Sequence, residues 1–280
     1  MNKYLFRKNV ANAANYAIFG ILMLFFLGPI IWMLSLSFKP STEIFAFPPT
    51  LIPGNPTLSE YIFVLKNSFV PHYILNSMFI AVLLVIVIFV VCIPGAYGFS
   101  RFRFRGKKTL LMLVLSFQMI APIVIVVPLY RMLNKVGLLN THTGLILTLL
   151  GVQVPFSVWL LKGFLDSIPI SLDESAFVDG ASRFRVLIDI VLPSAAPGLA
   201  AVTVFNFIFG WSDYLLPSII LSSERLTPFA VGVYVFQSGY GTMWNKVAAA
   251  SVLGLAPVLL MYVLLQRYFI SGLTAGAVKG

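Results

Sequence analysis

An uncharged, apolar run over residues 9–38 constrains this chain more than any other feature. It is longer than the roughly 20 residues that a helix needs to cross the hydrocarbon core of a bilayer. Comparable runs recur along the chain, which is 59% hydrophobic and only 10% charged, whereas about a quarter of the residues in a soluble domain are charged. The sequence therefore predicts an all-α integral membrane protein with one transmembrane domain, residues 1–280.

Short polar or proline-rich stretches divide the apolar runs into predicted membrane spans. Six spans are expected, at about residues 13–37, 71–98, 109–130, 139–165, 191–217 and 247–269. The first run follows Lys3, Arg7 and Lys8, as in a signal peptide, but it is too long for one and no small-residue cleavage site follows it. With both termini in the cytoplasm, most of the 19 lysines and arginines lie on the cytoplasmic side, as the positive-inside rule requires.

The densest positive run, residues 101–108, is interleaved with Phe102 and Phe104. Basic and aromatic side chains in this pattern can also hold single-stranded nucleic acid. Because the run directly adjoins two apolar spans, we interpret it as a topology anchor, with membrane lipid and no nucleic acid as its surroundings.

A markedly charged stretch, residues 173–189, separates the fourth and fifth predicted spans. Its ionised side chains are Asp173, Glu174, Asp179, Arg183, Arg185 and Asp189. At about 3 kcal/mol for each charge near the bilayer centre, the stretch cannot lie in hydrocarbon. We expect it to be structured and exposed on the cytoplasmic side.

Local signals predict two short helices in this coupling segment, residues 170–190. Pro169 ends the preceding helix, and Ser171 and Glu174 have the spacing of a capping box. Gly180 can take the left-handed conformation that closes a two-turn helix. A second helix can begin at Ser182, and its predicted apolar face consists of Phe184, Leu187, Ile188 and Val191. Asp189 is expected to pair with Arg185.

The segment resembles the cytoplasmic "EAA" signature of permease subunits in ABC importers. The residues that carry the resemblance are Glu174, Ala176, Gly180, Ile190, Leu192 and Pro193. Residues 179–182, Asp-Gly-Ala-Ser, narrow the likeness to the maltose-type sugar permeases. Ser175 stands where the family usually has alanine, and Asp189 stands at a position that is usually uncharged.

The resemblance implies that the short helix docks in a cleft of an ATP-binding subunit, where Glu174 pairs with a basic residue. The residues that it assigns to ATPase coupling are Asp173, Glu174, Ala176, Asp179, Gly180, Ala181, Ser182 and Pro193. The tail, residues 272–280, is too small and glycine-rich to predict a stable helix. It resembles the tail of the maltose-type permease, which reaches between the two ATPase subunits. The tail residues expected there are Leu273, Thr274, Ala275 and Gly276.

Motifs for catalysis are missing from the sequence. It contains no phosphate-binding GxxxxGK[ST] loop, no HExxH and no GxSxG, so we expect no enzyme activity, and ATP and Mg²⁺ are expected on a partner ATPase. Cys92 is the one cysteine, and His72 and His142 are isolated, so no metal site is predicted.

Polar groups at membrane depth offer a possible substrate path. They are Gln118, Gln153, Asn206, Trp211, Asp213 and Tyr214. Neutral hydrogen-bonding groups beside aromatic rings suit a sugar. Polar side chains also join membrane helices to one another, and the sequence favours neither role.

These observations predict a permease subunit of an ABC importer for a sugar or oligosaccharide, in the bacterial cytoplasmic (inner) membrane. Its expected partners are a second permease, two ATP-binding subunits and an extracellular solute-binding protein. The expected mechanism is alternating access, in which the docked helix acts as a rigid lever on spans four and five. A polyol or a glycerol phosphodiester remains an alternative substrate. A stand-alone secondary carrier and a membrane scaffold are the rival classes, and neither needs a docking helix between residues 174 and 193.

Overall fold

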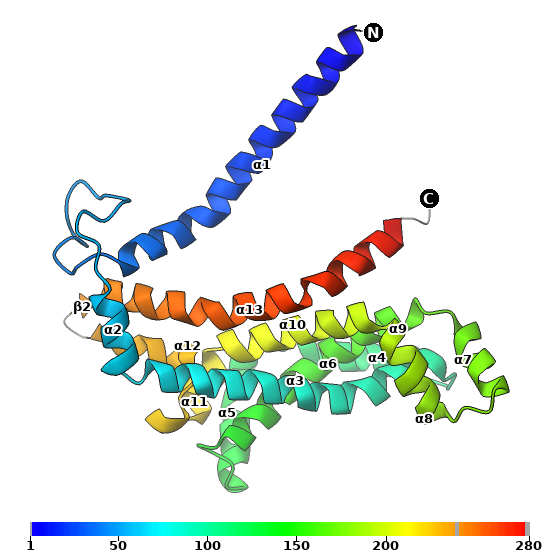
Figure 1. Cartoon of the computed structure of the whole chain (residues 1–280). Coiled ribbons are helices and arrows are strands. Elements are labelled where there is room, and N and C mark those ends of the chain that lie inside the picture. Colours follow the sequence, from blue (N-terminus) through cyan, green and yellow to red (C-terminus); the bar gives the residue numbers. More distant parts are fainter. Residues whose placement is uncertain (1, 239–240, 278–280) are drawn as a thin grey trace. The chain divides into compact units, whose positions relative to one another are not determined.

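The computed structural model of the chain describes residues 2–238 and 241–277 (Figure 1). These residues form two compact units, Met1–Ser68 with Val233–Leu253 and Phe69–Gly232 with Gly254–Gly280. Almost all elements are helices. The exception among the described residues is a hairpin of two-residue strands, β1 (Gln237–Ser238) and β2 (Gly241–Thr242), which the sequence analysis did not predict.

The first unit combines the N-terminal part of the chain with residues 233–253. It contains α1 (Asn2–Ser37), α2 (Ser59–Lys66), η4 (Val233–Phe236), the hairpin and the first turns of α13 (Trp244–Ala277). Ser37 Oγ lies 2.7 Å from the hydroxyl oxygen of Tyr61, and Lys246 Nζ lies 3.8 Å from the centre of the Phe63 ring. These contacts tie α1 and the start of α13 to α2.

The second unit is a helical bundle built around α3 (Val70–Arg101), α6 (His142–Asp166) and α10 (Ala196–Ser212). Its buried apolar core includes Ile80, Leu84, Leu149, Leu161 and Val202. Gly210 permits a close approach, because a Cβ atom there would lie 3.1 Å from the Ala81 Cα. Three shorter elements follow α10 in this unit. Helix α11 (Leu215–Ile220) packs on α6, η3 (Glu224–Leu226) packs on α3, and α12 (Phe229–Gly232) packs on α3 and α10.

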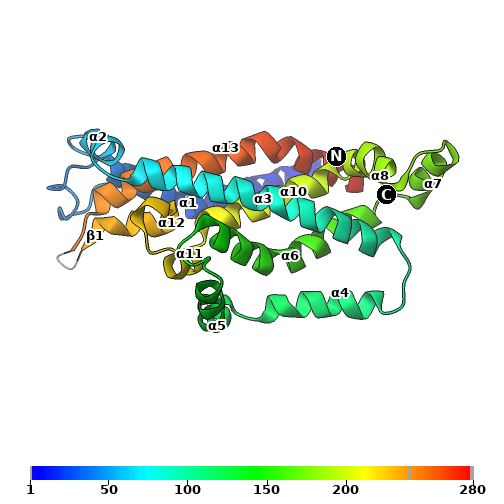
Figure 2. The same ribbon diagram turned by 90° about the horizontal axis from the view of Figure 1, so that it is seen from below.

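The third predicted span is bent rather than continuous. It consists of α4 (Lys107–Ser116), η1 (Phe117–Met119) and α5 (Pro122–Lys135), and its two halves meet at 93°. Figure 2 shows α5 turned away from the direction of α4. The break has a local cause, because Ala121 precedes proline and is extended, with φ −61° and ψ 131°. The predicted span at about 109–130 is therefore bent at residues 120 and 121, and is not one continuous helix.

The fifth predicted span, 191–217, is also interrupted. Helices α8 (Arg183–Val186) and α9 (Leu192–Ser194), with the π-helical turn η2 (Leu187–Val191) between them, meet α10 at 78°. Pro197 has no N–H to donate to the carbonyl of Pro193, which weakens the helix at this point. The helix then ends at Ser212, because Asp213 is extended.

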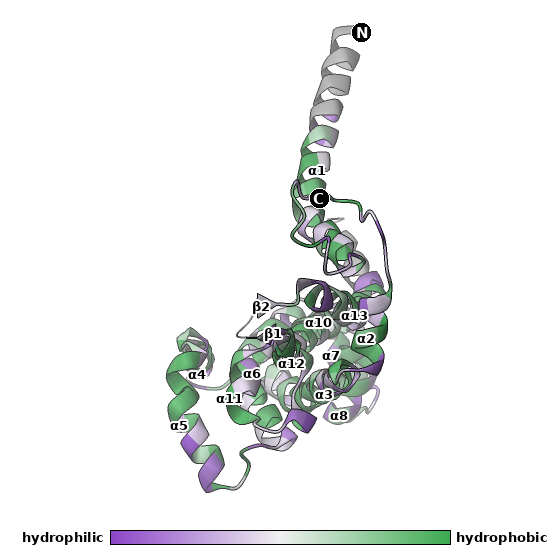
Figure 3. Cartoon of the chain, turned by 90° about the vertical axis from the view of Figure 1, so that its left-hand side faces the viewer, coloured by the Kyte–Doolittle hydropathy of each residue, from purple (hydrophilic) through white to green (hydrophobic). Residues whose placement is uncertain are grey.

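Four helical stretches are long and apolar enough to cross a membrane within the described part of the chain. They are Asn15–Ser37, Val70–Arg101, His142–Asp166 and Trp244–Tyr268. The number rises to six if each of the two bent pairs forms one span. The ribbons of α4 and α5 are largely hydrophobic in Figure 3, as a membrane location requires.

The predicted absence of helix in the tail was wrong as far as the structure describes it. Helix α13 continues through Gly272 and Gly276 and ends at Ala277. Residues 278–280 of the predicted tail lie outside the described residues.

Candidate functional site

The coupling segment begins with α7 (Ile170–Val178), which starts directly after Pro169. The predicted capping box was wrong: Pro169 occupies the N-cap position, no side chain caps the helix, and Ser171 already lies within it. The Ser171 carbonyl accepts a hydrogen bond from Ser175 Oγ at 2.9 Å. Together with α8, α7 lies at the end of the bundle opposite α11 and α12 (Figures 1 and 2).

The end of α7 confirms the prediction for Gly180, whose φ is +82°. The Ala181 N–H donates to the Ala176 carbonyl at 3.0 Å, and the Gly180 N–H donates to the Phe177 carbonyl at 3.1 Å. This pair of bonds is a Schellman motif, which satisfies carbonyls that the helix end leaves free. The chain therefore turns sharply after two helical turns.

The second short helix, α8, begins after Ser182 as predicted. Ser182 Oγ accepts a hydrogen bond from the Arg185 N–H at 3.3 Å. The predicted apolar face is only partly correct: Leu187 and Val191 are buried, whereas Phe184 is 74% and Ile188 is 43% exposed. The π-helical turn that follows widens the helix, so the packing face no longer keeps the α-helical spacing.

The inner face of α7 carries Asp173 and Ala176, which are both buried. Arg101, at the end of α3, donates from Nε to Asp173 Oδ2 at 2.8 Å and from Nη2 to Asp173 Oδ1 at 3.3 Å. The same guanidinium donates to the carbonyls of Leu165 at 3.1 Å and Ile168 at 3.2 Å. We call Arg101, Asp173 and these two carbonyls the arginine clasp. The clasp turns Asp173, predicted as an ATPase contact, toward the bundle.

Further polar contacts surround the clasp. Ser100 Oγ donates to Asp166 Oδ1 at 2.7 Å, and Lys162 forms an ion pair with Asp166. The Arg183 guanidinium lies 4.9 Å from the centre of the Phe102 ring. The end of α3 is thus joined to α6, which precedes the coupling segment, and to α8 within it.

The outer face of the segment is exposed and mixes apolar groups with carboxylates. Val178 is 88% exposed, and Glu174 is also exposed. Within the described chain, no hydrogen bond or ion pair of the Glu174 carboxylate is found. The other predicted coupling residues on the surface are Asp179, Gly180, Ser182 and Pro193, while Ala181 is half-buried. Asp189 pairs with Arg185 at 3.3 Å, as predicted.

The polar residues at membrane depth are not gathered into one site. Asn206 is fully buried, and its Nδ2 donates to Ser157 Oγ at 2.9 Å and to the Val202 carbonyl at 2.9 Å. Its Oδ1 has no hydrogen-bond partner. Gln153 is also buried. The Asn206–Ser157 bond therefore joins α10 to α6.

The remaining residues of the predicted path lie in three different settings. Trp211 is buried, with its ring stacked 6.0 Å from Phe207 and 6.1 Å from Phe229. Asp213 Oδ2 accepts the Leu216 N–H at 3.3 Å, and Tyr214 is 45% exposed. Gln118 lines a cavity of about 650 Å³ beside the bend between α4 and α5. The substrate role of these residues stays a prediction.

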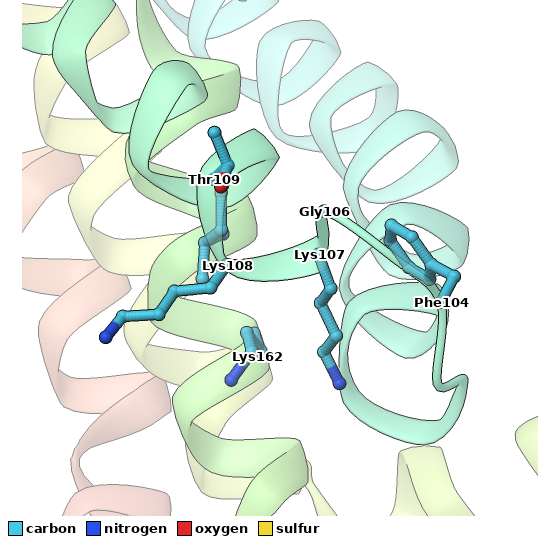
Figure 4. A pocket seen from close by; sticks show the side chains of 7 residues that line it. Phe104, Gly106, Lys107, Lys108, Thr109 and Lys162 are labelled. Atoms are coloured by element: carbon cyan, nitrogen blue, oxygen red, sulfur yellow. The ribbon is translucent and has the colours of Figure 1, made fainter.

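A second cavity, of about 490 Å³, is lined by lysines (Figure 4). Lys107 Nζ donates to the carbonyls of Ser100 and Phe102, at 3.4 Å and 3.2 Å. Lys108 and Lys162 also line the cavity. Part of the basic run that the sequence analysis interpreted as a topology anchor therefore stabilises the turn between α3 and α4.

The two histidines contact backbone carbonyls. His72 Nε2 lies 2.9 Å from the Arg225 carbonyl oxygen, and His142 Nε2 lies 3.1 Å from that of Leu226. Across the described residues, no group of three or more His, Cys, Asp or Glu side chains is arranged to hold a metal ion.

Arg101 is the residue of the site that sequence reasoning missed. It was interpreted only as one positive charge of residues 101–108. The sequence places Arg101 as the first cation after a long apolar span. It does not show that Asp173 faces inward, where a carboxylate needs a basic partner.

Comparison with known proteins shows which family this chain belongs to. The sequence pattern of the "Binding-protein-dependent transport system inner membrane component" family matches residues 92–274. The inner membrane ABC transporter permease protein YcjP of Escherichia coli is 36% identical over 94% of both chains. The trehalose/maltose transport system permease protein MalG of Thermococcus litoralis is 34% identical over 90% of this chain and 91% of its own.

Solved structures agree with these relatives. A chain from a bacterial ABC transporter involved in the import of the acidic polysaccharide alginate has a TM-score of 0.80 and 25% identity, over 94% of this chain and 98% of its own. A chain of the MetNI methionine ABC transporter has the same fold, with a TM-score of 0.60 over 72% of this chain and 95% of its own. The chain is therefore a member of the binding-protein-dependent transport inner membrane component family, a non-catalytic, multi-pass permease of the inner membrane.

Proposed function

We propose that this permease forms, with a second permease subunit, the translocation path of an ATP-driven importer for a sugar or oligosaccharide. Two ATP-binding subunits supply the energy, and a binding protein outside the membrane delivers the solute. The chain spans the membrane six times, each bent pair counting as one span, and both termini are cytoplasmic. The spans are those expected from the sequence, with the third and fifth bent.

The observation that carries this proposal is the two-sided coupling segment. Its inner face is fastened to the bundle through Asp173 and Ala176, while its outer face exposes Glu174 and Val178. Exposed apolar side chains beside an exposed carboxylate suit a protein partner with a hydrophobic cleft and a basic residue. An ATP-binding subunit with such a cleft would hold α7 and displace it when ATP binds.

The proposed mechanism is alternating access. Closure of the two ATP-binding subunits moves the docked α7, and α7 transmits the displacement to α6 and α10, which it connects in sequence. The outward end of the path then opens to the binding protein while the inward end closes. The chain itself supplies rigid contacts and no covalent chemistry.

A carbohydrate substrate is supported by the named functions of several relatives. The relative from Thermococcus litoralis is named for trehalose and maltose transport. GanQ of Bacillus subtilis, which is named for galactooligosaccharide transport, is 34% identical over 98% of both chains. A permease from Agrobacterium fabrum that is named for sulfoquinovosyl glycerol is 30% identical over 93% of this chain and 92% of its own, so a glycosylated polyol is also a candidate substrate. A glycerol phosphodiester stays an alternative from the sequence analysis alone. The cavity at Gln118 gives one part of the predicted path room for a ligand. A stand-alone secondary carrier would leave the outer face of α7 without a role.

The end of α13 is a second proposed contact with the ATP-binding subunits. The residues concerned are Leu273, Thr274, Ala275 and Gly276, which form part of the helix.

Substitution of Glu174 tests the docking proposal. Charge-assisted contacts contribute about 1.5 to 3 kcal/mol when they are partly desolvated, so Glu174→Lys should weaken assembly or uncouple ATP hydrolysis from uptake. The measurement is uptake and solute-stimulated ATPase activity of the purified complex with its binding protein.

The matched control is Asp189→Lys, which makes the same change of charge at an exposed carboxylate of the same segment. We expect little effect from the control, because its pair with Arg185 is solvent-exposed. Normal transport and normal stimulated hydrolysis in Glu174→Lys would contradict the proposed docking.

A further inference from the structure

We propose that Arg101 is a positioning residue for energy coupling: it fastens α7 to the ends of both α3 and α6, so that α3 moves together with the docked helix. This inference rests on the proposed docking of the coupling segment. It adds α3 to the elements that receive the motion, and it gives Asp173 an internal role in place of contact with the ATP-binding subunit.

The Arg101 guanidinium links three elements, α3, α6 and α7. Arg101 is the last residue of α3 and its Nε and Nη2 bind both carboxylate oxygens of Asp173 on α7. Its Nη1 and Nη2 bind the carbonyls of Leu165, in the last turn of α6, and Ile168, in the link between α6 and α7. A planar guanidinium with five donors can make these contacts together, whereas a lysine ammonium cannot reproduce the fork.

The Arg101–Asp173 ion pair is buried, which distinguishes it from an exposed ion pair. The Arg101 and Asp173 side chains are only 7% and 4% exposed. Removing one member of a buried pair leaves the other charge without a partner, which is far more disruptive than breaking an exposed pair. The same segment contains an exposed Arg–Asp pair for comparison, Arg185 and Asp189, with side chains 74% and 57% exposed.

The packing of the rest of α7 determines how a force on this helix is transmitted. Ala176 packs into the core that contains Tyr97 of α3 and Leu165 of α6. The outer face of α7 makes no comparable contact, since Val178 is 88% exposed. A force applied to that face therefore reaches α3 through the clasp and the packing beneath it. Helix α3 also packs along α6 and α10, so its displacement reaches the centre of the bundle.

The test compares Arg101→Met, Arg101→Lys and Asp173→Asn in the full complex with its binding protein. We expect the ATP-binding subunits to co-purify normally, because Glu174 and Val178 are unchanged. Uptake per ATP hydrolysed should fall by about fivefold or more in Arg101→Met and in Asp173→Asn. Arg101→Lys should not restore it. The matched control, Arg185→Met, should retain the wild-type ratio.

A distance measurement separates coupling from general destabilisation. Spin labels at Leu172 on α7, which is not one of the docking residues, and at Val90 on α3, both exposed, report on the two helices after Cys92→Ala. In the wild type we expect the same Leu172–Val90 distance in the resting and ATP-bound complexes, because the helices move together. In Asp173→Asn, which changes no side-chain volume and keeps the Arg101 bonds to the two carbonyls, the distance should differ between the two states.

Two results would overturn the inference: a state-dependent Leu172–Val90 distance in the wild type, or wild-type uptake per ATP in both Arg101→Met and Asp173→Asn. If Arg101→Met does not assemble, Asp173→Asn alone decides between the outcomes. Failure of the docking proposal is distinguishable, because it would appear as normal coupling in Glu174→Lys. Normal coupling in the clasp variants with loss of coupling in Glu174→Lys would overturn the clasp and leave docking in place.

Discussion

Gly180 sets the angle between the docking helix and the rest of the coupling segment. Its φ of +82° is a left-handed conformation, and no atom lies within 4 Å of the position that a Cβ would occupy. Gly180→Val therefore meets no steric neighbour, and its cost of about 1 to 3 kcal/mol comes from the backbone alone. We expect it to lower uptake and stimulated ATPase activity, with Gly180→Asn milder because asparagine tolerates this conformation.

Gly106 supplies a control for this substitution. It has the same φ of +82° and no atom within 4 Å of a Cβ, but it lies before α4, outside the coupling segment. Gly106→Val should cost similar stability and leave the ratio of uptake to hydrolysis unchanged. Equal uptake per ATP for glycine, asparagine and valine at position 180 would show that coupling does not depend on the bend.

Local sequence signals predicted part of the coupling segment. The turn at Gly180, the start of α8 after Ser182 and the Arg185–Asp189 pair were predicted correctly, whereas the capping box at Ser171 was not. The partner of Asp173 was not predictable in the same way. Arg101 is 72 positions away in the sequence, and only the packing of α3 against α6 brings the two side chains together.

At the level of elements, the bends in the third and fifth spans were the main departure from the predicted fold. Proline alone does not identify such bends, since Pro29, Pro94, Pro155 and Pro257 lie inside unbroken helices. What distinguishes the third span is the extended backbone at Ile120 and Ala121 before Pro122. Neighbouring helices can support a proline in a membrane helix, and hydropathy carries no information about that support.

The C-terminal tail is another element whose structure differed from the prediction. Its composition argues against an isolated helix, but the costly first turn is already formed in α13, so the helix can extend through small residues to Ala277. Removal of residues 273–280 should leave membrane insertion intact and lower uptake, if this end contacts the ATP-binding subunits. Uptake at matched membrane levels is the measurement, and full uptake by the shortened chain would remove the tail from the coupling mechanism.

At the scale of the whole molecule, the second unit consists of a membrane bundle and an exposed segment at one of its ends. The predicted topology gave this division, because six charges between residues 173 and 189 cannot lie in hydrocarbon. What the sequence could not give is which side chains of the segment face the bundle. Asp173 and Glu174 are adjacent and both acidic, yet one is buried and the other exposed.

The central claim is that the outer face of α7 docks on an ATP-binding subunit. It is tested most directly by a photoreactive side chain at Val178, with Val90 of α3 as the control; these positions are 88% and 70% exposed. In membranes that contain the whole transporter, the account predicts a cross-link from position 178 to the ATP-binding subunit and none from position 90. Absence of that cross-link from position 178, in a complex that transports normally, would contradict it.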